Sequence, residues 1–191
     1  GAAYLFTRSG SIWTQQGSEI VGGSGVAPDF FGRSVGISGN TAVVEFRNQL
    51  NAGNRGAYFF DRTAGAWSER AKLSQPNVDG TYGAVAISGS SVLVGTAIYE
   101  RNGDTWTRQA QFTSTDGGTF NGFAEAGVAI SGTSAIIGAF TADVGTNVNQ
   151  GAAYVYLRSP DTDGDGLPDD WETNGVTVDG TFIDLPQMGA D

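Results

Sequence analysis

The stretch FGRSVGISGNTAVV (residues 31–44) decides the fold of this protein, because its central tripeptide recurs twice further along the chain. Ile-Ser-Gly stands at residues 37–39, 87–89 and 130–132. The glycine of each copy begins a turn-forming dipeptide, Gly-Asn, Gly-Ser or Gly-Thr, and a short apolar run follows. The pattern predicts a β-hairpin at the start of each of three units.

A second hairpin is predicted in each unit, with aromatic residues in its first arm and a tryptophan in its second. The pairs are residues 1–6 with Trp13, 56–60 with Trp67, and 97–99 with Trp106. One tryptophan at an equivalent place in each unit indicates packing between blades more simply than a platform for carbohydrate. Four strands per unit, without helical periodicity, are typical of β-propeller blades.

The last stretch of the body is similar in sequence to its first stretch. GAAYVYLRSP (residues 151–160) repeats six of the ten residues of GAAYLFTRSG (residues 1–10). We therefore interpret 151–158 as the third strand of a blade and 1–17 as the third and fourth strands of another. The predicted fold is all-β, with about three four-stranded propeller-type blades in residues 1–158, an incomplete propeller, and a tail at 159–191.

Closed propellers usually have about four to eight blades. We therefore expect either that the chain is a fragment of a longer protein or that other molecules complete its open ends. The ends are complementary, which favours other copies of the chain in a head-to-tail contact. Whether such copies would close a ring or extend a filament is left open by the sequence.

Two stretches, FGRSVGISGNTAVV and GAYFFDRTAGAWSERAKL (residues 56–73), resemble the FG-GAP repeats of bacterial secreted proteins and of integrin α-chain propellers. The resemblance extends over residues 1–158 and is closest where Phe31-Gly32 stands. Tyr82-Gly83 and Ala126-Gly127 take the place of Phe-Gly in the later units. It implies an extracellular or cell-surface protein, with another extracellular protein or a glycan as the class of ligand for the blades.

Charge separates the body from the tail. The net charge is −10, and residues 159–191 hold nine acidic residues and no Lys or Arg, whereas the body is nearly neutral. This balance disfavours nucleic acid as a partner and favours cations. No window approaches the roughly 18 unbroken apolar residues of a membrane span.

The tail carries the most specific motif. DTDGDGLPDDWE (residues 161–172) matches the calcium loop D-x-D-x-D-G-x5-E at every defined position. The predicted Ca²⁺ ligands are side-chain oxygens and one backbone carbonyl, from Asp161, Asp163, Asp165, Leu167 (the carbonyl), Asp169 and Glu172. The stretch also resembles the thrombospondin type-3 calcium repeats of bacterial secreted proteins.

Two weaker cation sites are considered. Asp179 and Asp184 follow the loop, and they form either a degenerate second site or turn caps. Residues 143–149 offer one carboxylate and two amides, which favours a solvated turn over a cation site.

The chain contains no His and no Cys. The G-x-S-x-G pattern at residues 32–36 therefore lacks the imidazole that a Ser-His-acid triad needs. We expect no enzymatic activity. The predicted function is that of a non-catalytic, calcium-binding extracellular structural or adhesion protein, and the alternative is the propeller and calcium-linker portion of a larger secreted enzyme or surface protein.

Overall fold

The structure is a computed structural model that describes residues 1–23, 30–48, 55–75, 83–114 and 122–157, together with the backbone of 176–178 and 181–183. Within these ranges every regular element is a β-strand, which confirms the predicted all-β fold. All strand pairs are antiparallel.

Two complete four-stranded sheets form the centre of the molecule. The first, blade 1, has the order β3 (Val35–Ser38), β4 (Thr41–Arg47), β5 (Arg55–Thr63), β6 (Ala66–Gln75). The second, blade 2, has the order β7 (Val85–Ser88), β8 (Ser91–Val94), β9 (Ala97–Asn102), β10 (Thr105–Gln111). In both, each strand pairs with the next one in sequence, as in a propeller blade.

Smaller sheets lie at the two ends. Blade 3 contains β11 (Phe123–Ser131), β12 (Ser134–Ala139) and β13 (Ala152–Leu157). The N-terminal hairpin contains β1 (Phe6–Ser9) and β2 (Ile12–Gln15). In the tail, β14 (Val176–Val178) pairs with β15 (Thr181–Ile183).

The three predicted Ile-Ser-Gly hairpins all form. Their turns fall at Gly39, Gly89 and Gly132, whose φ angles are 56°, 58° and 55°. Positive φ of this size is costly for residues with a Cβ and free for glycine. The repeated tripeptide is therefore a repeated turn.

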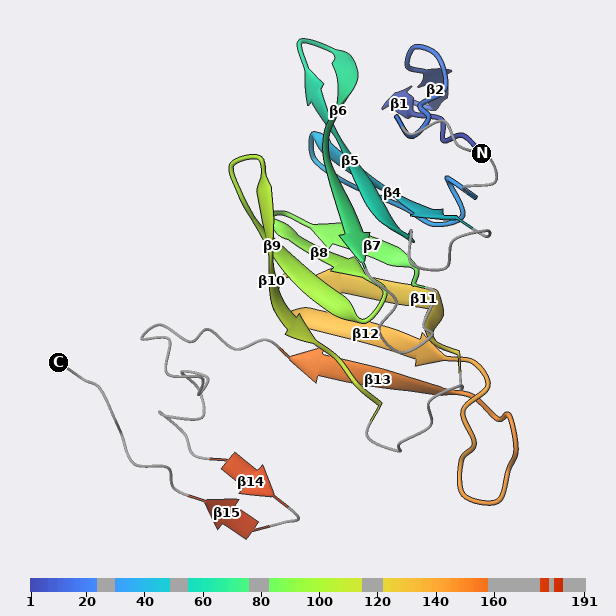
Figure 1. Ribbon diagram of the computed structural model, residues 1–191, viewed down its shortest axis with the longest axis vertical. Helices are drawn as coiled ribbons and strands as arrows, with labels where there is room; N and C mark the ends of the chain where they lie inside the picture. The colour runs from blue at the N-terminus through green and yellow to red at the C-terminus, as the bar shows by residue number, and fades with distance from the viewer. Residues whose placement is uncertain are drawn as a thin grey trace, which may run out of the picture.

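The sheets follow one another as a stack, from the N-terminal hairpin through blades 1 and 2 to blade 3 (Figure 1). The first strand of each blade lies beside the first strand of the next, β3 beside β7 and β7 beside β11. This is how the inner strands of a propeller are placed. None of the described sheets closes on itself.

Each blade packs through both faces. We call the face toward the following blade its back face and the face toward the preceding blade its front face. Alternation along a strand sends neighbours to opposite faces, so Val43 joins the core between blades 1 and 2, whereas Val44 joins the core on the front of blade 1. Leu93 and Ile98 of blade 2 likewise join the core shared with blade 3.

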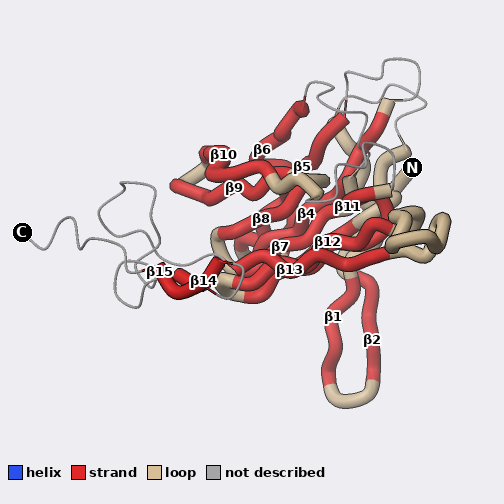
Figure 2. The backbone as a smooth tube through the Cα atoms, turned by 90° about the horizontal axis from the view of Figure 1, so that it is seen from below, coloured by secondary structure: helices blue, strands red, loops and turns tan. Residues whose placement is uncertain are grey.

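The base of the N-terminal hairpin packs on the front of blade 1. Ala3, Leu5 and Ile20 are partly buried against its core. The rest of the hairpin projects away from the stacked sheets, as Figure 2 shows. Ile12 is accordingly 68% exposed.

The structure corrects the predicted position of the Phe-Gly motif in the third unit. Phe31 packs edge-on against Tyr58, with ring centroids 5.7 Å apart, and Phe123 packs the same way on Tyr154 at 5.4 Å. Ala124, at φ 64°, stands where blade 1 has Gly32 at φ 91°. Phe123-Ala124, and not Ala126-Gly127, is therefore the counterpart of Phe31-Gly32; an irregularity in β11 after Phe123 hides it.

Candidate functional site

The junctions between blades repeat one hydrogen bond. The backbone N–H of Gly89 donates to the hydroxyl of Ser38 at 3.0 Å, and that of Gly132 donates to the hydroxyl of Ser88 at 3.2 Å. In both cases the serine of one Ile-Ser-Gly turn accepts from the glycine of the next. Ser34 of the G-x-S-x-G pattern also serves a junction, because its hydroxyl accepts from the N–H of Val85 at 2.9 Å.

Aromatic side chains fill the same junctions. Trp106 of blade 2 is buried and stacks on Phe59 of blade 1, with ring centroids 4.3 Å apart. Trp67 packs against the core on the front of blade 1. These two tryptophans pack between sheets as the repeat predicted, whereas Trp13, at the equivalent position in the N-terminal hairpin, is 64% exposed.

An ion pair also joins blades 1 and 2. Arg101 of β9 donates to both carboxylate oxygens of Asp61 on β5, at 2.9 Å from Nη1 to Oδ1, and the Thr41 hydroxyl donates to the same Oδ1 at 2.8 Å. The hydrogen bond from Arg101 and, to a lesser degree, that from Thr41 lower the pKa of Asp61. The carboxylate therefore stays charged at neutral pH, in the form that holds the junction.

In the part of the chain that the structure describes, no further sheet covers the back face of blade 3. By strand register, Ile136 corresponds to Val43 and Leu93 of the preceding blades, which are both 0% exposed, yet Ile136 is 43% exposed. Its cross-strand neighbour Val155 is 66% exposed and corresponds to Phe59, which is 1% exposed. The positions that other blades bury therefore lie open here.

The front of the stack has a matching opening. Val35 and Ile37 of β3 are 58% and 57% exposed, whereas their counterparts in β7, Val85 and Ile87, are 4% and 9% exposed. Among the described residues, the base of the N-terminal hairpin is what packs on this side of blade 1. The stack thus presents an apolar row at each end.

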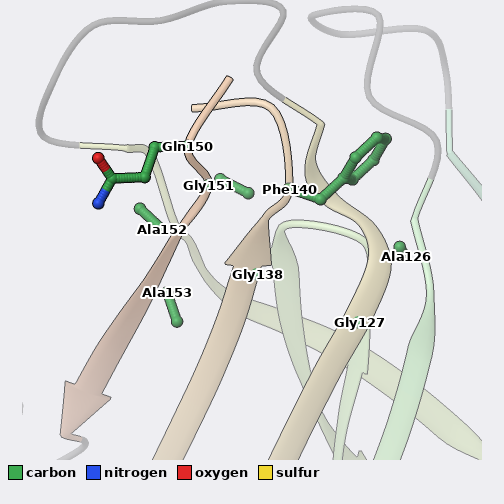
Figure 3. Close-up of a pocket in the computed structure, with 9 residues that line it drawn as sticks. Ala126, Gly127, Gly138, Phe140, Gln150, Gly151, Ala152 and Ala153 are labelled. Atoms are coloured by element: carbon green, nitrogen blue, oxygen red, sulfur yellow. The ribbon is translucent and has the colours of Figure 1, made fainter. Parts of the chain in front are cut away.

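A surface depression of about 610 Å³ lies on blade 3 (Figure 3). It is lined by small residues with two larger ones at its sides: Ala126, Gly127, Gly138, Ala139, Phe140, Gln150, Gly151, Ala152 and Ala153. None of these described lining side chains is titratable or nucleophilic. Gly138 and Ala153 are register partners two positions from Ile136 and Val155, so the depression continues the open back face.

Glu45 is the one buried acidic side chain of the described residues. It lies on β4, with Arg33 Nη1 3.6 Å from its Oε1, while its Oε2 has no hydrogen-bond partner among the described residues. Burial raises the pKa of Glu45, although Arg33 and Arg47 act in the opposite direction. An acid in such a setting favours the protonated form.

The predicted calcium ligands Asp161, Asp163, Asp165, Leu167, Asp169 and Glu172, and the weaker pair Asp179 and Asp184, lie outside the described residues. Among the residues that are described, no three acidic side chains gather as a metal site. In the loop after β12, the carboxylate of Asp143 accepts the N–H of Asn149 at 2.7 Å. This carboxylate helps to close the turn that the sequence favoured there.

The described part of the molecule is thus a stack of antiparallel, blade-like sheets with open ends. The family described as FG-GAP repeat matches residues 106–156, from Trp106 in β10 to Tyr156 in β13. FG-GAP repeats are found in extracellular and adhesion-type proteins. No match was found among curated proteins or among solved structures.

The match supports the FG-GAP part of the resemblance, although it falls on the later units and not on the first, where Phe-Gly stands. In the described ranges no helix has the length and apolar character needed to cross a membrane. The sequence predicted open ends but did not identify the residues that form the open faces. The repeat contained a signal for the open back face. Val155 has the register position of Phe59, and the described residues contain no later blade that could cover it.

Proposed function

We propose that this chain is a non-catalytic, calcium-binding structural or adhesion module of the extracellular space, whose blades are completed by other copies of the chain. One observation carries the proposal: positions buried at internal blade junctions are exposed at both ends of the stack. The FG-GAP match at residues 106–156 supports the extracellular setting. The calcium loop of the tail, read as a thrombospondin type-3-like repeat, supports the metal dependence.

Exposed apolar rows of this kind favour association. A contiguous apolar face on a soluble protein marks an interaction surface more often than an isolated apolar side chain does. Sheet edges and faces that match each other join by the same packing that holds the molecule together. The contact is heterologous, so it produces a ring or a filament according to the rotation between copies.

Calcium has a separate role in the proposal. Six carboxylates within residues 161–172 repel one another unless a cation neutralises them. With Ca²⁺ bound, the acidic tail becomes a compact element that connects the blades to a neighbour. Assembly would then depend on calcium through the tail, although the blades fold without it.

Sedimentation velocity of the 191-residue chain, over a wide concentration range and with either calcium or chelator, tests the assembly. We expect the sedimentation coefficient to rise with concentration, and more steeply with calcium. A chain that stays monomeric at every concentration in both buffers would overturn the assembly and favour the alternative, a propeller and calcium linker within a larger secreted enzyme or surface protein.

A further inference from the structure

We propose that two copies join through a composite junction in which the back face of blade 3 of one copy packs on the front face of blade 1 of the next. This inference rests on the proposed function, because it names the surfaces by which copies of the chain associate. The contact would reproduce the two internal junctions of the molecule residue by residue. Three features of the structure carry it.

The first feature is the serine–glycine ladder. Ser38 accepts from Gly89, and Ser88 accepts from Gly132, so the same pair recurs from blade to blade. Ser131 and Gly39 occupy the corresponding positions at the two ends of the stack, and both are exposed. In the composite junction the hydroxyl of Ser131 accepts the N–H of Gly39 from the next copy.

The second feature is the apolar row beside this hydrogen bond. At the junction of blades 1 and 2, Val43 packs in one cluster with Val85 and Ile87. Ile136 is the counterpart of Val43, and Val35 and Ile37 are the counterparts of Val85 and Ile87. Seating Ile136 of one copy against Val35 and Ile37 of the next therefore restores a packing that the sequence already uses.

The third feature is charge. On the back faces of blades 1 and 2, the position that faces the next blade holds an acid, Asp61 or Glu100, and Asp61 pairs with Arg101. In blade 3 this position is Leu157, which is 80% exposed. The counterpart of Arg101 on the front of blade 1 is Arg62, so at this position the composite junction packs Leu157 against the aliphatic part of an arginine and forms no ion pair.

The N-terminal hairpin limits how the faces meet. Leu5 at its base already packs on the front of blade 1, and the repeat of residues 1–10 at 151–160 makes it the counterpart of Val155. β13 is held more firmly than the N-terminal hairpin. Six residue pairs join β13 to β12, and Tyr154 and Tyr156 pack against the core shared with blade 2. We therefore expect the hairpin, and not β13, to move aside.

A pair of face variants tests the proposal. Ile136→Glu places a charge on the back face of blade 3, and Ile37→Glu places one on the front of blade 1. Each variant alone should weaken association at least about tenfold, because the contact would bury an unpaired carboxylate. Mixed in equal amounts, the two should form a dimer and nothing larger, since one intact junction remains between them.

Val148→Glu is the matched control. Val148 is 74% exposed in the loop after β12 and belongs to neither row, so this variant should associate as the unmodified chain does. Circular dichroism and thermal unfolding verify that all three variants fold. If the unmodified chain associates and Ile136→Glu and Ile37→Glu associate equally well, the composite junction is wrong and the proposed function stands. If the unmodified chain stays monomeric, both are wrong.

Cross-linking provides a second readout that does not depend on weakened binding. The chain has no cysteine, so Ser131→Cys in one molecule and Asn40→Cys in another are the only thiols in a mixture. A short bismaleimide should join them into a dimer. Ser88→Cys with Thr133→Cys in one molecule is the internal standard, and Ser131→Cys mixed with Thr146→Cys is the negative control. A reactive internal standard without the intermolecular product would overturn the proposal.

Discussion

Residues at equivalent positions of the repeats differ in burial, according to whether a neighbouring blade covers them. Phe59 and Val155 occupy the same register position, but the following blade covers only Phe59. The acid of Phe60-Asp61-Arg62 becomes Leu157 in Tyr156-Leu157-Arg158. Position in the stack, and not the repeat pattern alone, thus sets the burial of each residue.

Glu172 and Asp170 offer a matched test of the calcium loop. Glu172 stands at loop position 12, where a carboxylate binds with two oxygens, whereas Asp170 falls between ligand positions. Calorimetric titration with calcium should show a loss of affinity of about tenfold or more for Glu172→Gln and little change for Asp170→Asn. Equal losses in the two variants would count against the assignment.

Glu45 gives a prediction on pH. Its raised pKa means that the folded chain binds this proton more tightly than the unfolded chain, so its contribution to stability is greatest below the unfolded value of 4.5 and is lost as pH rises through the folded value. Glu45→Gln removes the buried charge and should raise the free energy of unfolding at pH 7 by about 1 kcal/mol. The gain should shrink toward zero below pH 4.5.

Urea unfolding at pH 7 and pH 4 measures this difference, with the exposed Glu19→Gln as control. A Glu45→Gln variant that is less stable than the unmodified chain at pH 7 would mean that the ion pair with Arg33 outweighs the cost of burial.

The hairpins, as elements, form from local signals but acquire their stability from neighbours. Each Ile-Ser-Gly turn closes on a glycine at positive φ, which a short sequence can specify. The aromatic hairpins need a second sheet. β5–β6 and β9–β10 have one, whereas β1–β2 shows exposed or half-buried side chains along its whole length.

The tryptophans test this dependence at equivalent positions. Trp106 is 8% exposed and stacks on Phe59, so Trp106→Ala should lower the free energy of unfolding by about 3–5 kcal/mol. Trp13 is 64% exposed, and Trp13→Ala should change the free energy of unfolding by less than about 0.5 kcal/mol. Chemical denaturation of both variants measures the two changes in the free energy of unfolding. Similar losses would mean that another part of the protein covers Trp13 in solution.

The whole molecule combines a blade stack with an acidic tail, and their stabilities should be independent. The cores of the blades are apolar clusters, and the predicted calcium ligands, the weaker pair included, all fall in residues 161–184. Calcium that binds only the folded loop stabilises only that loop.

Chelation should therefore increase amide hydrogen exchange in residues 159–191 and leave blades 1 to 3 unchanged. Hydrogen exchange followed by mass spectrometry, with and without calcium, measures both regions in one experiment. The measurement is best made at low protein concentration, so that loss of assembly does not expose the end faces. Comparable increases throughout residues 1–157 would show that calcium also holds the blades.

The sequence by itself determined the hairpins of the body, their turns and the order of the sheets, but not the short tail hairpin of β14 and β15. Alternation of apolar residues, glycines at the turns and the spacing of Ile-Ser-Gly are local properties, and local properties specify hairpins. The predicted calcium loop is a local pattern in the same sense, and its ligands remain a prediction from the sequence. The Phe-Gly alignment went wrong at Phe123, because an irregularity in β11 shifts the register without leaving a mark in the composition.

Only the tertiary structure decided which faces are buried. Val43, Leu93 and Ile136 are equivalent in sequence, and two of them are covered while the third is open. Burial depends on whether another sheet lies about 10 Å away, which is a relation between distant segments and not a property of the strand. The junction role of Ser38 and Ser88 became visible for the same reason, since each serine meets a glycine more than 40 residues away.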